Sequence, residues 1–301
     1  MNQQWNLKQH SFSKSSESVT LIHVENEPCQ KTDIIADEEI KERLFDPIKS
    51  FLNMIETIMK SKDRLLIQGI VPNLIELFEQ SFSNDPFGKT HLSFALYRLL
   101  ILQANGFELD TARVIKIIRE NFVLKPHHTG LFCRFLSMFA DDENIGKFLL
   151  SFLKSEDNIY EWQELKVQQT LLKFNIGISR SDVDFFINSA SDRNKHYAVR
   201  AFYFLLVGKY GNNRDRELIT DCYKHFSEAY TKMAIILAVQ ELGKNSRNSF
   251  YSRVKSQSND EEIDEFIDYV KSLSSPIYYL VTELPKIETY DKFEEPSYEP
   301  V

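Results

Sequence analysis

Residues 199–208 read Val-Arg-Ala-Phe-Tyr-Phe-Leu-Leu-Val-Gly, an apolar and aromatic run that predicts the buried part of a helix over 195–210. Two similar segments flank it: residues 167–172 lie 32 residues earlier and residues 232–237 lie 33 residues later. A period of about 20–50 residues with two helices per unit is typical of an α-solenoid, in which stacked hairpins bury their apolar stripes against each other. The alternative is a non-repetitive helical bundle. Glycines expected in the loops that end the three helices are Gly177, Gly208 and Gly243.

The composition supports an all-α fold. Among 301 residues there are only 9 glycines and 9 prolines, so helix breakers are scarce, and the hydrophobic content of 43 % is sufficient for a core. Glycine is usually needed at the strand-to-helix turns of parallel α/β folds, which makes that class less favoured. We therefore expect a folded and mainly helical chain.

Helical periodicity extends over most of the sequence. We expect a first helix around Ile40–Ile55, and Asp110 to cap the helix that follows it. Asn105 and Gly106 are expected to end the helix before Asp110. Further helices are predicted over 64–80, 90–104, 111–121, 128–139, 143–155, 160–174, 180–189, 195–210, 214–226, 229–242, 245–255 and 261–272.

Two irregular arms are expected around one continuous helical-repeat domain. Residues 1–36 form a polar arm whose only strand-like run is 19–24, Val-Thr-Leu-Ile-His-Val. The repeat domain is predicted to span 37–273, and an acidic tail to follow over 274–301.

The charge of the chain is unevenly distributed. The net charge is −8, yet residues 190–256 carry 12 basic and 6 acidic side chains, whereas residues 257–301 carry 3 basic and 12 acidic ones. A basic segment attracts phosphate or an acidic partner, and it can also face the chain's own acidic tail.

The basic segment also contains tyrosines, whose rings can stack on bases. In a helical repeat, corresponding residues of successive units line one surface. We therefore predict a surface within residues 193–255 that binds a protein or a nucleic acid. A solvated surface without a partner is the alternative. The candidate binding residues are Arg193, Lys195, Arg200, Arg214, Arg247, Tyr197 and Tyr203.

Catalytic motifs give little support to an enzyme. The segment 139–142, Phe-Ala-Asp-Asp, resembles the magnesium-binding turn of polymerases, but its flanks predict helices rather than strands, so Asp141 or Asp142 is expected to cap the next helix. His127 and His128 have no further ligand nearby for a metal. We predict no catalytic residue, metal or cofactor. The alternatives are a metal-dependent enzyme using Asp141 and Asp142, or a regulatory subunit inhibited by its acidic tail.

Residues 192–201, Asp-Arg-Asn-Lys-His-Tyr-Ala-Val-Arg-Ala, resemble a HEAT-type repeat, with 205–208, Leu-Leu-Val-Gly, at the end of its helix. The Val-Arg helix and residues 243–251, Gly-Lys-Asn-Ser-Arg-Asn-Ser-Phe-Tyr, also resemble the helical region that follows the polymerase in bacterial reverse transcriptases of abortive infection and phage defence. The resemblance implies an accessory role in antiviral defence, with a reverse transcriptase and its nucleic acid as partners. It does not imply polymerisation by this chain, because fingers, palm and usable catalytic aspartates are missing.

The remaining sequence features concern the compartment. Cys29, Cys133 and Cys222 form neither a Cys-x-x-Cys pair nor an even set, which favours the reducing cytoplasm. The longest apolar runs, such as 202–207, are far shorter than the roughly 20 residues of a membrane span, so no membrane association is expected.

Overall fold

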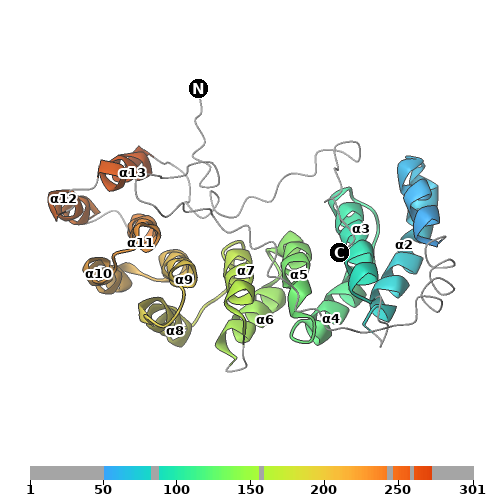
Figure 1. The fold of residues 1–301 in the computed structure, drawn as a ribbon, viewed down its shortest axis with the longest axis horizontal. Helices are drawn as coiled ribbons and strands as arrows, with labels where there is room; N and C mark the ends of the chain where they lie inside the picture. The colour runs from blue at the N-terminus through green and yellow to red at the C-terminus, as the bar shows by residue number, and fades with distance from the viewer. Residues whose placement is uncertain (1–50, 83–87, 156–158, 243–246, 258–260, 273–301) are drawn as a thin grey trace, which may run out of the picture. The chain divides into compact units, whose positions relative to one another are not determined.

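The computed structural model describes residues 51–82, 88–155, 159–242, 247–257 and 261–272. Within these ranges every regular element is a helix (Figure 1), which confirms the predicted all-α class for this part of the chain. The possible strand at 19–24, the arms 1–36 and 274–301 and the loop glycine Gly243 lie outside the described residues.

The described residues form two compact units that meet in sequence between Val123 and Leu124. In the first unit, residues 51–60 are helical and are followed by α2 (Arg64–Gln80), α3 (Gly88–Ala104) and α4 (Thr111–Asn121). The bounds of α2 and α4 match the predicted ranges and α3 begins two residues earlier than predicted, whereas the helical residues 51–60 extend past the predicted end at Ile55.

Local capping sets the ends of the first unit's helices. Asp63 Oδ1 accepts the backbone N–H groups of Leu65 and Leu66 at 2.9 and 3.2 Å and so starts α2. Asp110 Oδ1 accepts the N–H of Arg113 at 3.0 Å, which confirms it as the predicted cap of α4. Gly106, just after α3, has φ = +71°, a conformation that glycine adopts without steric cost.

The second unit continues the helical pattern from Leu124 onward. Short 3₁₀ turns lie at Pro126–His128, Ser137–Phe139 and Tyr223–His225. Its α-helices are α5 (Thr129–Leu136), α6 (Glu143–Lys154), α7 (Glu161–Leu171), α8 (Arg180–Ser191), α9 (Tyr197–Tyr210), α10 (Asn213–Cys222), α11 (Ala229–Glu241), α12 (Arg247–Gln257) and α13 (Glu261–Ser272).

Alternate helices of the second unit pack side by side. In Figure 1, α5, α7, α9 and α11 follow one another in one row, and α6, α8 and α10 form a row beside them. Helix α7 contacts α5 and α9, and α9 also contacts α8 and α11. Because α9 has neighbours on several sides, every residue from Ala198 to Gly208 is buried, which explains why its sequence is apolar all round.

Gly208 serves close packing rather than a loop. The predicted loop glycine lies inside α9, and a Cβ atom built on it would lie 2.7 Å from the Cα of Ala238 in α11. The absence of a side chain therefore lets these two helices approach closely. The sequence alone does not distinguish a glycine that ends a helix from one that lets a neighbouring helix approach closely.

Contacts between alternate helices recur at a fixed interval in sequence. Thr129, Gln163, Tyr197 and Thr231 follow one another every 34 residues, each within the first turn of its helix. Gln163 Nε2 donates to Thr129 Oγ1 at 3.0 Å, and Thr231 Oγ1 donates a long bond of 3.5 Å to the Tyr197 carbonyl. The N-terminal ends of α5 and α7 therefore adjoin, and so do those of α9 and α11.

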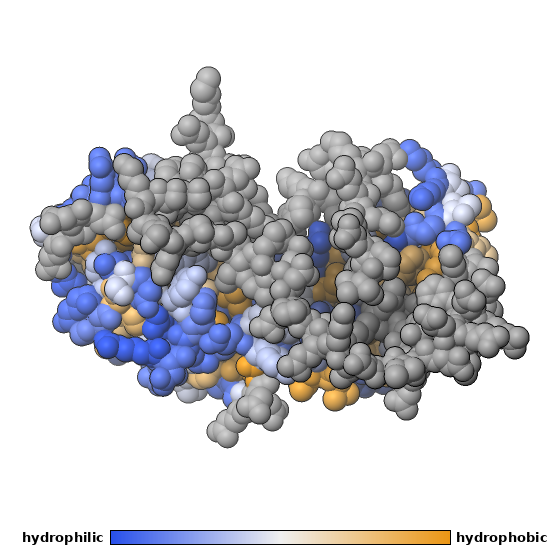
Figure 2. Space-filling view, in the orientation of Figure 1, coloured by the Kyte–Doolittle hydropathy of each residue, from blue (hydrophilic) through white to orange (hydrophobic). Residues whose placement is uncertain are grey.

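The second row of helices carries polar residues outward. Figure 2 shows a mainly hydrophilic surface over α8 and α10. On α10, Arg214, Glu217 and Asp221 are exposed, and Leu218 is the exposed apolar exception.

Candidate functional site

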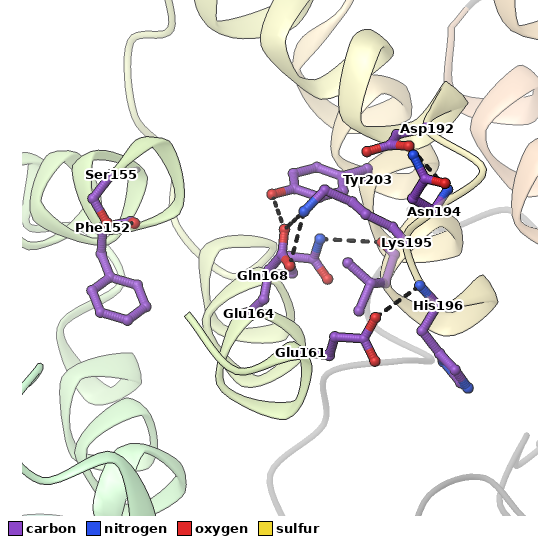
Figure 3. Close-up of polar contacts among 11 residues, drawn as sticks. Phe152, Ser155, Glu161, Glu164, Gln168, Asp192, Asn194, Lys195, His196 and Tyr203 are labelled. Atoms are coloured by element: carbon purple, nitrogen blue, oxygen red, sulfur yellow. Dashed lines mark hydrogen bonds and ion pairs between the residues drawn. The ribbon is translucent and has the colours of Figure 1, made fainter. Parts of the chain in front are cut away.

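The turn between α8 and α9 positions the first predicted binding residues. Asp192 accepts the N–H of Asn194 through its carboxylate at 2.9 Å and the N–H of Lys195 through its carbonyl at 3.2 Å. His196 then caps α9, with Nδ1 accepting the N–H of Ala198 at 3.3 Å. This turn directs the Lys195 side chain back toward α7, as Figure 3 shows.

Lys195 forms an ion pair with a carboxylate of α7. Its Nζ lies 2.8 and 3.1 Å from the two carboxylate oxygens of Glu164, and Tyr203 donates its hydroxyl to the same carboxylate at 2.5 Å. Glu164 and Tyr203 are buried, whereas the Lys195 side chain is 30 % exposed. The buried charge of Glu164 is thereby compensated by one cation and one hydroxyl.

Burial and the neighbouring Glu164 carboxylate both raise the pKa of Tyr203 above its ordinary value. The Tyr203 hydroxyl consequently remains protonated and acts as a donor. Gln168, one turn further along α7, donates to the Val199 carbonyl at 3.2 Å and adds a second tie between the same helices.

A buried cation, Arg200, joins α9 to the N-terminus of α11. Arg200 donates to Glu228 at 2.6 Å, and its guanidinium lies 4.8 Å from the centre of the Phe226 ring. Partial burial of Glu228 opposes ionisation, but hydrogen bonds from its own backbone and from Arg200 prevail and lower the pKa of this carboxyl.

The predicted binding residues therefore do not all lie on one surface. Arg200 and Tyr203 are buried and engaged inside the helix stack, which corrects the expectation that they face solvent. Arg193 and Arg214 are exposed, and Tyr197 is half-buried. Arg247 is the first residue of α12, and its side chain lies outside the described part. A binding role for the exposed members stays a prediction.

The acidic pair behaves as a helix start. Asp142 Oδ1 accepts the N–H groups of Asn144 and Ile145 at 2.8 and 3.3 Å, which confirms capping of α6. Within the described ranges there is no group of three or more His, Cys, Asp or Glu side chains that could hold a metal ion. Cys133 and Cys222 are free, and burial raises the pKa of the Cys133 thiol to about 12.

A row of aromatic side chains that the sequence analysis did not predict lies at the N-terminal ends of α5, α7, α9 and α11, which we call the first-row helices. The His127 and Trp162 rings stack with centres 6.2 Å apart, Tyr160 stacks on the same tryptophan at 6.2 Å, and both pairs are tilted by only 16°. The signal was present, because an aromatic residue recurs at intervals of about 34 residues beside the start of each helix. We call this set the aromatic row: His127, Tyr160, Trp162, His196, Tyr197 and Tyr230.

Contacts join each pair of neighbouring helices along the aromatic row, two of them between rings and one a hydrogen bond. His127 and Trp162 link α5 to α7, and Glu161 accepts the His196 N–H at 3.1 Å, which links α7 to α9. The Tyr197 and Tyr230 rings, 6.1 Å apart and nearly perpendicular, link α9 to α11. In Figure 3 the His196 ring points away from the Glu164 cluster.

Comparisons with protein-family models, with curated proteins and with solved structures found no match to this chain. No helix in the described part of the chain combines the length and the apolar character that crossing a bilayer requires.

Proposed function

We propose that this protein is a non-catalytic helical-repeat module, an α-solenoid of HEAT-like antiparallel hairpins, that binds a protein or a nucleic acid. The observation that carries the proposal is that hydrogen bonds between residues 34 positions apart join the first turns of α5 and α7 and, again, those of α9 and α11. Recurrent contacts at a fixed interval are expected of stacked repeat units, whose neighbouring elements form one extended surface.

The distribution of polar groups supports a binding role. Glu164, Arg200 and Tyr203 bond to neighbouring helices and stabilise the stack, whereas Arg193 and Arg214 are exposed. We propose that these two exposed arginines, which flank opposite ends of α9, and Tyr197 in its first turn contribute to contacts within residues 193–255.

The test is capture of partners by the full chain. The tagged protein and its Arg193→Glu/Arg214→Glu variant are cross-linked in cells, and the bound proteins and nucleic acids are identified. We expect the variant to lose a partner that the wild type retains, with unchanged far-ultraviolet circular dichroism. Equal recovery of every partner by both proteins would contradict a role for these arginines.

We further propose an accessory role beside a defence reverse transcriptase, resting on the resemblance of 192–201 and 243–251 alone. The neighbouring reading frame in the genome tests it. A polymerase core immediately upstream supports the role, and an unrelated gene there contradicts it.

A further inference from the structure

We infer that the aromatic row binds single-stranded nucleic acid by stacking bases on its rings. The inference rests on the proposed function and names the partner. Its surface overlaps the predicted one at Arg193 and Tyr197 and extends beyond residues 193–255 to His127, Tyr160 and Trp162.

Three rings of the aromatic row, those of His127, Tyr160 and Trp162, lie in similar orientations, and two of these residues are exposed. Tyr160 is 60 % exposed and His127 is exposed as well, while Trp162 between them is half-buried and holds both rings nearly parallel. Base–aromatic stacking tolerates any sequence, because every base has a π-face, and it is the main contact of proteins that bind single strands. A duplex keeps its bases stacked internally and cannot use these rings in the same way.

Charge at this edge is compatible with phosphate. Two of its carboxylates, Glu164 and Glu228, are paired with Lys195 and Arg200, whereas Glu161 and Asp192 accept backbone N–H groups. Arg193 is exposed in the turn that leads into the row. Hydrogen bonds join the N-terminal ends of α5, α7, α9 and α11 in turn, and the dipoles of these helices favour negative charge there.

The recurrence of the row favours a nucleic acid over a protein. Aromatic residues recur about every 34 residues. Ring contacts join α5 to α7 and α9 to α11, and the Glu161–His196 hydrogen bond joins α7 to α9. A ligand made of identical units presents the same group to each repeat, as single-stranded RNA does to repeat proteins that place one base on each repeat. A folded protein surface has no such regularity.

Trp162 provides a direct probe of stacking. The chain has two tryptophans, so the full-length Trp5→Phe protein reports fluorescence from Trp162 alone. It is titrated with a labelled single-stranded oligothymidylate of about 20 nucleotides, longer than the 4–16 nucleotides that one typical single-strand module covers. We expect quenching of Trp162 together with a rise in the anisotropy of the label, and weak binding of a duplex of equal length.

The variant that tests the row is His127→Ala/Tyr160→Ala in the same background. Loss of two stacking rings is expected to weaken oligonucleotide binding at least about tenfold. Leu218→Ala is the matched control, because it removes an exposed apolar side chain from α10, and its affinity should equal that of the parent protein. If the alanine variant fails to fold, His127→Leu/Tyr160→Leu keeps apolar contacts on Trp162 but removes the planar faces, and the same loss is expected.

Three results would overturn the inference: no oligonucleotide binding, binding without Trp162 quenching, or unchanged affinity in both row variants. Equal affinity for the duplex would also contradict stacking. The inference can fail while the proposed function survives. If oligonucleotides do not bind, but the row variant loses a protein that the wild type captures, the chain is still a binding module and its partner is that protein.

Discussion

At the scale of single residues, the Tyr203 hydroxyl stabilises the fold, which could not be inferred from its position in a basic segment. It donates to the buried Glu164 carboxylate at 2.5 Å, and hydrogen bonds to charged groups contribute about 1.5–3 kcal/mol. We predict that Tyr203→Phe lowers the free energy of unfolding by that amount in urea titrations. Tyr197→Phe, at a half-buried tyrosine of the same helix, is the control and should change stability little. Equal effects of the two substitutions would refute the special role of Tyr203.

Lys173, two residues beyond α7, should make stability depend on pH. Burial, and secondarily the neighbouring Arg134 charge, lower the pKa of Lys173 from 10.5 to about 8. Between these values the unfolded chain binds more protons than the folded one, so this residue's contribution to stability rises with pH. The cost of its charge is fully present below pH 8 and is relieved as pH approaches 10.5.

The measurement compares Lys173→Met with the wild type in urea at pH 7, 8, 9 and 10. We expect the methionine variant's relative stability to be highest at pH 7 and to decline as pH rises. Lys224→Met, which replaces an exposed lysine, should show no such decline. A constant difference between Lys173→Met and the wild type would contradict the prediction.

The sequence predicted those residue roles that depend on near neighbours. Asp110 and Asp142 bond to N–H groups two or three residues ahead, so their capping could be read from position alone. The Lys195–Glu164 and Arg200–Glu228 pairs join residues 31 and 28 positions apart. A formal charge identifies neither such a partner nor the burial of the pair, which is why Arg200 and Tyr203 were expected at the surface.

At the scale of helices, the contact of α9 with α11 depends on Gly208. An added Cβ would lie 2.7 Å from the Cα and 3.0 Å from the Cβ of Ala238, and overpacking of this kind costs about 1–3 kcal/mol. This exceeds the gain in helix propensity of up to about 1 kcal/mol on replacing glycine by alanine. We therefore predict that Gly208→Ala lowers the melting temperature.

Gly69 in α2 offers the matched substitution. A Cβ at this position would meet nothing within 4 Å, so Gly69→Ala should stabilise its helix by up to about 1 kcal/mol. Opposite signs of the two changes, measured by thermal unfolding, support close packing at Gly208. Stabilisation by both would show that the two helices separate at little cost.

Helix positions were predictable, whereas helix neighbours were not. Apolar periodicity and capping residues located α2, α4 and α13 within about one residue. The aromatic row was not predicted from the sequence because its members share a surface only after the helices pack together. Tyr160 and His127, for example, lie 33 residues apart and meet the same ring of Trp162.

At the scale of the whole molecule, the described residues fall into two compact units. The first unit buries Leu74 of α2 and the second buries Ile236 of α11, both 0 % exposed. Replacing a fully buried leucine or isoleucine by alanine costs about 2–5 kcal/mol. Because the internal contacts of each unit are its own, we expect each loss to be felt within the unit that carries it.

Hydrogen exchange followed by mass spectrometry resolves this expectation along the chain. Ile236→Ala should raise amide exchange in the helices from α5 to α13 while leaving α2, α3 and α4 near their wild-type protection, and Leu74→Ala should do the reverse. Leu218→Ala, at an exposed position of α10, should leave both patterns unchanged. Raised exchange throughout the chain in both core variants would instead mean that the two units unfold as one cooperative body, because local loss would then be transmitted to every helix.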